Sequence, residues 1–295
     1  MNYSGNAKMG NSMFETISIH TDIKKATNHL SYNKIKSGKY FWENDTEPTI
    51  WISMLIPSYN TNQFYLVECV NSIKEQIGTF GLELVWIDDC SSLENTTFLV
   101  NLLKTELEPL NHLKIVYQKT RINRGISFCL HQGVFLCTNE LIFRMDSDDI
   151  MLNNRIQKQL EFMGTNPSCV MCGSNIICFN EDNGIKNETS RTTHKNTLSW
   201  QEYKKNPVDW FLNHPTMCFK KTPVLAAGNY RKHFKVPFED LELELRVLKK
   251  YGVIFNLPEC LLLYRQHSNQ TSTKIDNLHL ITKLKKQLIL RITGG

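Results

Sequence analysis

The stretch Glu140-Leu-Ile-Phe-Arg-Met-Asp-Ser-Asp-Asp149 is a short apolar run that ends in three carboxylates. An apolar run of this length is typical of a buried strand, and in an open α/β sheet ligands bind where the carboxyl ends of the strands emerge. Side chains alternate along an extended chain, so Asp146 and Asp148 share one face and Asp149 points to the other. We therefore expect the first two acids at the functional end of a central strand.

Two carboxylates at this spacing suit a hard divalent cation, Mg²⁺ or Mn²⁺, which would also bind the phosphate oxygens of a substrate. The same acids would be ordinary in a turn that leads into a helix N-terminus, because Asp is common in both places. The acid cluster alone leaves both interpretations open.

Strand and helix patterns alternate along the chain before this stretch. Continuous apolar runs indicate buried strands, and apolar residues at spacings of three and four indicate helices. The predicted strands are residues 49–57, 82–89, 113–117 and 140–149, and the predicted helices between them are residues 66–77, 98–107 and 123–134. This alternation predicts βαβ units, and hence an α/β fold with a mainly parallel sheet flanked by helices.

The second half of the chain continues less regularly. The patterns predict a helix over residues 156–163, a strand over 169–179, a strand that ends at Phe219, a helix over 238–252 and a strand over 253–264. Residues 180–196 show no clear period and are expected to form a long loop, which in a compact domain is usually functional or disordered.

The patterns divide the chain into three parts. Residues 1–48 are expected to be an N-terminal extension that packs loosely or is partly disordered. Residues 49–270 form a single α/β domain. Residues 271–295 form an amphipathic helix with leucines and isoleucines on one side and lysines among them. We interpret this helix as docked on the domain, with peripheral contact with a membrane surface as the alternative.

Composition excludes several classes of protein. Of the 295 residues 41% are hydrophobic, and the formal net charge is +5, which suits an anionic ligand. No apolar run reaches the roughly 18 residues that span a bilayer, and no secretory signal begins the sequence, so a cytoplasmic protein is expected. The absence of a basic arm and of zinc-finger spacing predicts no nucleic-acid partner. The absence of GxGxxG and GxxxxGKS/T motifs argues against a dinucleotide fold and a P-loop.

Several motifs occur in a single order along the chain. They are Ile52-Ser-Met-Leu-Ile-Pro-Ser-Tyr-Asn60, Ile87-Asp-Asp-Cys-Ser91, Asn123-Arg-Gly-Ile-Ser127, Met145-Asp-Ser-Asp-Asp149, Phe238-Glu-Asp-Leu241 and Tyr264-Arg-Gln-His267. Together they resemble family 2 glycosyltransferases of the GT-A fold, over roughly residues 50–270. The resemblance implies a Rossmann-like catalytic domain that transfers a sugar from a nucleotide-diphospho-sugar, in most such enzymes a UDP-sugar. The acceptor would be a hydroxyl of a glycan, a lipid-linked sugar or a protein.

The resemblance also implies inversion at the anomeric carbon, assistance by Mn²⁺ or Mg²⁺, and roles for individual residues. The nucleotide-sugar would contact Pro57, Ser58, Tyr59, Asn60, Asp88, Asp89, Asn123, Arg124, Gly125, Asp146 and Ser147. The metal would be bound by Asp146, Asp148 and His267. The catalytic base would be Asp240, with Glu239 in support.

The chain departs from the family pattern at two places. Cys90 stands where many relatives have a glycine. This difference leaves open the conformation of the turn, and whether Asp88 or Asp89 is the acid that contacts the nucleobase. Leu130 and His131 stand where many have an Arg-Asn pair, so a contact with the donor is either missing or supplied by Arg121 or Arg124.

Each assigned residue has a structural alternative. Asp88 and Asp89 fit an ordinary turn, Glu239 and Asp240 could only complement a helix dipole, and His267 could be a structural histidine. For the whole protein, a nucleotidyltransferase, a catalytically silent glycan-binding relative and a nucleic-acid-binding protein remain as competing interpretations.

Overall fold

The computed structural model describes residues 14–17, 38–182, 184–207, 210–232, 238–268, 270 and 278–294. The strands are β1 (Phe14–Ile17), β2 (Trp51–Ser58), β3 (Gly81–Asp88), β4 (Leu113–Thr120), β5 (Leu141–Arg144), β6 (Ile150–Met151), β7 (Met171–Asp182), β8 (Ile185–Arg191), β9 (Thr197–Ser199), β10 (Cys218–Lys220) and β11 (Val253–Arg265). The helices are α1 (Gln63–Lys74), α2 (Leu93–Glu106), α3 (Ile126–Leu136), α4 (Arg155–Thr165), α5 (Trp200–Lys205), α6 (Lys221–Ala226), α7 (Glu239–Tyr251) and α8 (Leu278–Thr293), with short 3₁₀ turns at Phe41–Glu43 and His214–Thr216.

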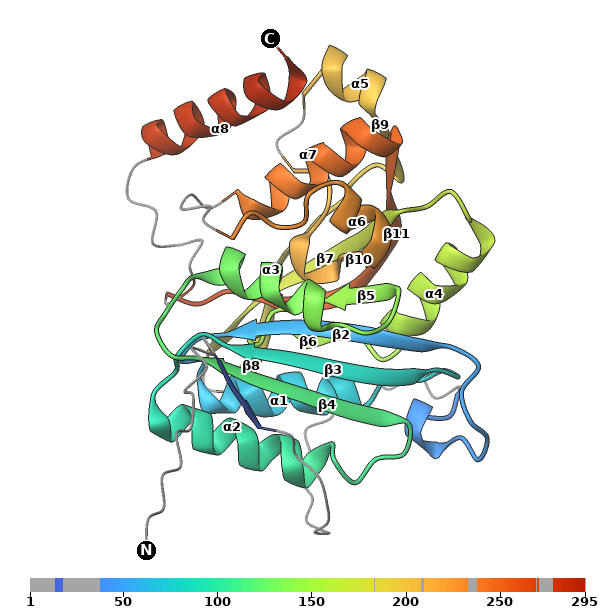
Figure 1. Ribbon diagram of the computed structural model, residues 1–295, viewed down its shortest axis with the longest axis vertical. Coiled ribbons are helices and arrows are strands. Elements are labelled where there is room, and N and C mark those ends of the chain that lie inside the picture. The colour runs from blue at the N-terminus through green and yellow to red at the C-terminus, as the bar shows by residue number, and fades with distance from the viewer. Residues whose placement is uncertain are drawn as a thin grey trace, which may run out of the picture.

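The strands form one sheet in the order β1-β4-β3-β2-β5-β10-β7-β11-β6, with β8 paired to β7 and β9 to β11. The pairs β4-β3, β3-β2, β2-β5 and β7-β11 are parallel, whereas β10 runs antiparallel to both of its neighbours. The prediction of an α/β fold with helices on both sides of the sheet is confirmed (Figure 1).

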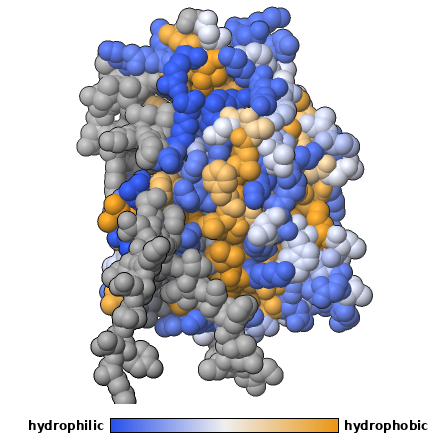
Figure 2. Space-filling model, in the orientation of Figure 1, coloured by the Kyte–Doolittle hydropathy of each residue, from blue (hydrophilic) through white to orange (hydrophobic). Residues whose placement is uncertain are grey.

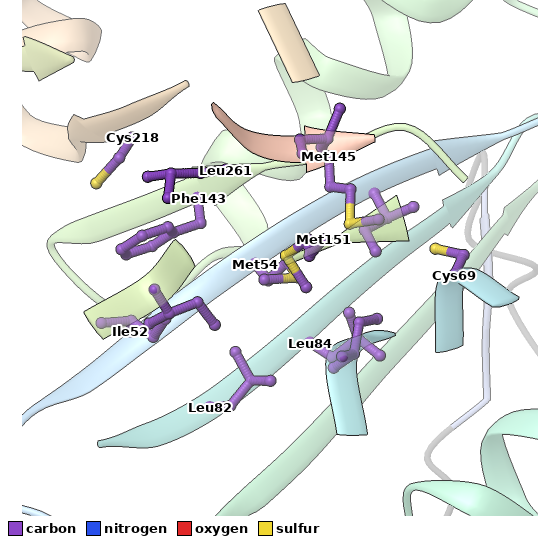
Figure 3. Packing of buried hydrophobic residues seen from close by; sticks show 14 of the residues in the cluster. Ile52, Met54, Cys69, Leu82, Leu84, Phe143, Met145, Met151, Cys218 and Leu261 are labelled. Carbon is purple, nitrogen blue, oxygen red and sulfur yellow. The ribbon is translucent and has the colours of Figure 1, made fainter. Parts of the chain in front are cut away.

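Helices cover the two faces of the first four parallel strands separately. Figure 1 shows α1 and α2 on one side of β2, β3 and β4, and α3 on the other. Side chains alternate along each strand, so Ile52 and Met54 of β2 pack toward Leu82 and Leu84 of β3 in one cluster, as Figure 3 shows. Leu55 joins the other cluster. β2 and β3 are therefore buried on both faces, which explains their nearly continuous apolar sequences.

Two expectations about local structure are wrong. The central strand ends at Arg144, and the acids follow it in a turn, so the alternation of an extended strand does not fix where they point. Residues 180–196 are not a long loop: β7 runs to Asp182 and pairs with β8 in an antiparallel hairpin. Most side chains of β8 are exposed, and a strand with no buried face lacks the alternation that reveals strands in sequence.

Part of the predicted N-terminal extension lies on the core. Phe41 is fully buried and stacks on Phe80 with ring centroids 5.1 Å apart. The Trp42 indole N–H donates to the carbonyl of Lys74 at 2.9 Å. Residues 1–13 and 18–37 of the predicted extension lie outside the described residues.

The C-terminal helix α8 lies beside α7 (Figure 1). Leu288 and Ile292 of α8 are buried, and Lys249 of α7 donates to the carbonyl of Ile292 at 2.7 Å. In the part of the chain that the structure describes, every helix is too short or too polar to cross a bilayer. The face seen in Figure 2 mixes hydrophilic and hydrophobic residues.

Candidate active site

The ends of three adjacent strands bring several predicted site residues to one edge of the sheet. Ser58 at the end of β2 pairs with Asp88 at the end of β3. On the other side of β2, Leu55 pairs with Arg144, the last residue of β5. The turn that carries Asp146 to Asp149 therefore emerges beside the ends of β2 and β3, as expected for ligand-binding residues in an open α/β sheet.

Arg144 forms a bidentate ion pair with Asp146. Arg144 Nη2 lies 2.5 Å from Asp146 Oδ1, and Nη1 donates to Oδ2 at 2.7 Å. The arginine side chain is only 1% exposed, so its charge needs this partner. Burial raises the pKa of Asp146, and the Arg144 charge opposes that rise. Each carboxylate oxygen keeps a second lone pair, so Asp146 remains able to accept another contact.

Asp148 meets His267, which comes from the segment after β11. His267 Nε2 lies 3.1 Å from Asp148 Oδ2, although the two residues are 119 positions apart in the sequence. Their side chains are 25% and 20% exposed, so both remain accessible to a ligand. The Tyr65 ring lies against His267 with centroids 5.2 Å apart.

Asp149 points into the protein. It is fully buried, and the backbone N–H of Arg265 donates to its Oδ1 at 2.9 Å. Burial raises the pKa of Asp149 well above its ordinary value, with the charges of Asp148 and Asp146 adding to the effect. Asp149 is thus separated from the first two acids, which leaves Asp146 and Asp148 as candidate ligands.

Asp88 is satisfied inside the protein. Its Oδ2 accepts from the Tyr117 hydroxyl at 2.7 Å and from the Thr96 hydroxyl at 2.9 Å, and its Oδ1 accepts from the Ser91 N–H at 2.8 Å. The side chain is fully buried. In this structure Asp88 fixes the turn after β3, and no sequence pattern indicated Tyr117 or Thr96 as its partners.

Asp89 binds the backbone of residues 123–125, which the sequence analysis predicted to contact the nucleotide-sugar. Its carboxylate accepts from the N–H groups of Arg124 at 2.8 Å and Gly125 at 2.7 Å. The Arg124 guanidinium lies over the Phe128 ring, 4.7 Å from its centroid. Asn123 and Arg124 are exposed. The structure therefore brings residues 123–125 to the end of β3 through backbone contacts with Asp89.

The loop after β2 is joined to both neighbouring turns. The Asn60 N–H donates to Ser91 Oγ at 2.9 Å, and Asn60 Oδ1 accepts from the Ser92 N–H at 2.8 Å. Thr61 Oγ1 and Ser147 Oγ lie 2.7 Å apart, which connects this loop to the acid turn. Tyr59 is 53% exposed at the same place, where its ring can contact a ligand. Nearer the strand, Ser58 Oγ accepts from the Trp86 indole, while Pro57 belongs to β2 itself.

Glu239 and Asp240 begin α7. Burial raises the pKa of Glu239 to about 8, and the Asp240 charge adds to that rise. Burial also raises the pKa of Asp240, against a backbone hydrogen bond from Leu241, whose N–H donates to Asp240 Oδ1 at 2.7 Å. The helix N-terminus would favour the ionised forms. Here desolvation outweighs it, which the position in sequence could not indicate.

Arg144 connects the acids of α7 electrostatically to those of the β5 turn. Its charge lowers the pKa of Glu239 and of Asp240, and the charges of Asp146 and Glu239 raise its own. Sequence reasoning missed this residue. Its signal is an arginine inside an apolar strand run, because a buried charge requires a nearby counter-charge.

Two other histidines have internal partners. His214 Nε2 lies 2.9 Å from the Tyr230 hydroxyl, and burial lowers the pKa of His214 well below its ordinary value. His131 Nδ1 lies 2.6 Å from the carbonyl of Tyr230. Both histidines therefore bind the Tyr230 segment.

Comparison with known proteins decides the family. Residues 53–225 match the model described as "Glycosyl transferase family 2". The chain belongs to glycosyl transferase family 2. Membership makes the protein a glycosyltransferase, of enzyme class EC 2.4, and decides against the nucleotidyltransferase and nucleic-acid-binding interpretations.

This glycosyltransferase is similar to one bacterial relative over three quarters of its length and to another over less than half. It is 30% identical over 227 residues to "Amylovoran biosynthesis glycosyltransferase AmsE" of Erwinia amylovora, covering 75% of this chain and 79% of AmsE. It is 31% identical over 126 residues to "UDP-Gal:alpha-D-GlcNAc-diphosphoundecaprenol beta-1,3-galactosyltransferase" of Escherichia coli, covering 43% and 44%.

The fold is similar to that of S. aureus TarS, residues 1–349, solved in complex with UDP-GlcNAc. The TM-score is 0.59 at 17% sequence identity, over 82% of this chain and 67% of that one. A second structure of the same TarS segment, in complex with UDP, has 66% of its length covered, slightly under two thirds. The GT-A fold of this glycosyltransferase is therefore confirmed.

The turn after β3 contains Cys90 at the position where the resemblance to the family led us to expect a glycine. Cys90 adopts a positive φ of 67°, in the left-handed region that a glycine occupies without steric cost. The Asp88 hydrogen bonds described above fix this turn on the following residue, Ser91. Cysteine thus replaces the family's glycine without opening the turn.

Asp148 and His267 fit a divalent cation. Adjacent ligands of an octahedral ion with bonds of about 2.1 Å lie about 3 Å apart, close to the 3.1 Å between Asp148 Oδ2 and His267 Nε2. Over the described ranges, no three His, Cys, Asp or Glu side chains form a group that could hold a metal. An ion here would need further ligands, and substrate phosphate oxygens are the usual ones for Mg²⁺.

Proposed function

We propose that this family 2 glycosyltransferase moves a sugar from a UDP-sugar to an acceptor hydroxyl, with inversion, in the assembly of a cell-surface polysaccharide or a lipid-linked glycan. The observation that carries the proposal is the presence of two acid groups around one buried arginine. Asp146 and Asp148, with His267, lie at the strand ends, and Glu239 and Asp240 begin α7. A displacement reaction needs both a site for the leaving diphosphate and a base for the acceptor.

Relatives support the donor and acceptor classes. The E. coli relative is named for UDP-Gal and a diphosphoundecaprenol acceptor, and the TarS structure holds UDP-GlcNAc. AmsE is named for amylovoran biosynthesis. We infer a UDP-sugar donor for this enzyme and an acceptor that is itself a glycan, free or attached to a lipid.

Asp148 and His267 would hold Mn²⁺ or Mg²⁺, bordered by Asp146. A cation in this position would neutralise the diphosphate as it leaves. Arg144 keeps Asp146 oriented, and the joined loops at residues 57–60 and 123–125, together with Ser147, would bind the nucleoside and its phosphates. The buried Asp88 and Asp89 would hold the adjoining turns in place. The exposed residues in these loops are Tyr59, Asn60, Asn123 and Arg124.

Asp240 would accept the proton of the acceptor hydroxyl as that oxygen attacks the anomeric carbon. A raised pKa makes a carboxylate a stronger base, and the Arg144 charge keeps the ionised form accessible. The Asp240 charge raises the pKa of Glu239, and because repulsion between two carboxylates is mutual, an ionised Glu239 would in turn disfavour ionisation of Asp240.

A thermal-shift experiment tests the donor class. We expect UDP-sugars to raise the melting temperature of the purified chain by several degrees in the presence of Mn²⁺, because ligand at 100 times Kd stabilises a protein by about 2.7 kcal/mol. GDP-, ADP- and dTDP-sugars serve as controls. A larger shift with one of these controls, or no shift with any nucleotide sugar, would contradict the proposal.

Glu239→Gln should change the pH dependence of transfer. The base acts only when ionised, and burial raises the pKa of Asp240, so in the wild type kcat/KM should rise with pH above the range in which an ordinary aspartate ionises. The repulsion between the two carboxylates is mutual, so removing the Glu239 carboxylate should lower the pKa of Asp240 and move the acid limb of the profile to lower pH. A profile measured from pH 5.5 to 8.5 at saturating Mn²⁺ checks this; an unshifted acid limb would show that the two carboxyls do not titrate together.

A further inference from the structure

We propose that Arg265 is the positioning residue of the cation site: it sets the separation of Asp148 and His267 and thereby the affinity for the divalent ion. The proposal rests on the metal-dependent function proposed above. Arg265 touches neither the donor nor the reacting atoms in that scheme, so its effect would pass through the two ligands.

Arg265 is hydrogen-bonded to the acid turn twice. Its backbone N–H donates to Asp149 Oδ1 at 2.9 Å, and its side-chain Nε donates to the carbonyl of Asp148 at 2.9 Å. The first bond anchors the turn to the end of β11, and the second holds the backbone of Asp148 itself. His267 follows only two residues later, so one residue connects both candidate ligands.

Strand pairing extends this connection. β6, which begins directly after Asp149, pairs antiparallel with β11, with Ile150 opposite Leu263. The turn and the His267 segment therefore leave the same short ladder together. A shift of Arg265 along β11 would change the position of His267 relative to Asp148.

The Arg265 guanidinium is fixed on all sides. Its carbon lies 4.2 Å from the centroid of the Tyr65 ring and 4.7 Å from that of Phe179. Nη2 forms an ion pair with Glu68 of α1, and Nη1 forms one with Glu181 of β7. The residue is 1% exposed. A planar fork with five donors can make these contacts while Nε still reaches Asp148, whereas a lysine ammonium cannot.

Tyr65 links the arginine to the histidine ring. The same ring that lies on the guanidinium also lies beside His267, with centroids 5.2 Å apart. Arg265 therefore acts on the pair at three points: the carbonyl of Asp148, the carboxylate of Asp149 and, through Tyr65, the imidazole of His267. A role limited to the ion pairs with Glu68 and Glu181 would not account for the hydrogen bond from Arg265 Nε to the carbonyl of Asp148.

The test measures Mn²⁺ affinity directly, from the electron paramagnetic resonance signal of free Mn²⁺ titrated with the full chain in the presence of UDP, with a titration of UDP alone as the blank. Arg265→Lys should raise the Kd for Mn²⁺ by about 10–100-fold, the usual loss when a residue that supports metal ligands is changed. High Mn²⁺ concentration should then restore UDP binding. The metal-free melting temperature is recorded alongside, because breaking a buried ion pair also destabilises the fold.

Lys186→Met is the matched control. Lys186 pairs with the same Glu68 carboxylate at 2.5 Å, from β8, and is also buried. The Lys186→Met variant should have a lower melting temperature than the wild type and an Mn²⁺ affinity close to that of the wild type. Should Arg265→Lys fail to fold, Glu181→Gln loosens the guanidinium more gently and should raise the Kd by a smaller factor.

The outcomes separate this proposal from the metal assignment. Wild-type Mn²⁺ affinity in folded Arg265→Lys, or in Glu181→Gln when the first variant does not fold, overturns the positioning role while Asp148→Ala still abolishes binding. Equal loss of affinity in Lys186→Met also overturns it, because any break in the network would then suffice. A wild-type chain that binds no Mn²⁺ overturns both the metal assignment and the role of Arg265.

Discussion

Asp240→Asn should reduce sugar transfer by about 10²–10⁴-fold, the contribution attributed to general acid–base catalysis, with donor affinity close to that of the wild type. The asparagine carbonyl can still accept the hydrogen bond from the Leu241 N–H that Asp240 Oδ1 receives at 2.7 Å. The start of α7 should therefore remain in place. What the variant loses is the capacity to accept a proton from the acceptor hydroxyl.

Two measurements on the same purified variant decide the role of Asp240: the Kd for UDP-sugar and the rate of transfer. Glu239→Gln, at the adjacent position, is the control variant, and it should keep a substantial rate of sugar transfer near its own pH optimum. Full activity in Asp240→Asn would exclude Asp240 as the base. Loss of donor binding would place it on the donor side or in a structural role.

Asp148→Ala should abolish most metal-dependent donor binding. The carboxylate of Asp148 lies 3.1 Å from His267 Nε2, and the alanine leaves a single candidate ligand of this pair. Without the cation the diphosphate charge is not neutralised, so UDP affinity in Mn²⁺ should fall to the value that the wild type shows in EDTA. Titration calorimetry of UDP, with and without Mn²⁺, measures the effect.

His267→Ala provides an intermediate case. It should weaken Mn²⁺ affinity and leave the fold intact, because its side chain is partly exposed. Unchanged affinity together with a large loss of stability would make His267 a structural residue. Equal UDP affinity with and without Mn²⁺ in the wild type would contradict the metal assignment as a whole.

The sequence by itself determined the class of fold and the family. Buried strands such as β2 and β3 are apolar on both faces, and α7 has acids at its start and Lys249, Lys250 and Gly252 at its end. These signals depend on neighbours within one element, so the sequence carries them directly. The order of short polar motifs at strand ends then identified the glycosyltransferase.

Only the tertiary structure decided how the site residues are paired. The bond between Asp148 and His267 spans 119 positions, and that between Arg265 and the Asp148 carbonyl spans 117. No periodicity reports such contacts, because they depend on which strands become neighbours in the sheet. The inward orientation of Asp88 has the same origin, since its partners come from β4 and α2.

The protonation of the candidate base also depended on the whole fold. Position at a helix N-terminus predicts a lowered pKa for Glu239 and Asp240, yet burial raises both. Desolvation is set by every element that packs around a group, whereas the helix dipole is set by one element alone. The chain's sequence thus indicated which groups are candidates for the reaction, and their packing determined the direction in which the pKa of each is shifted.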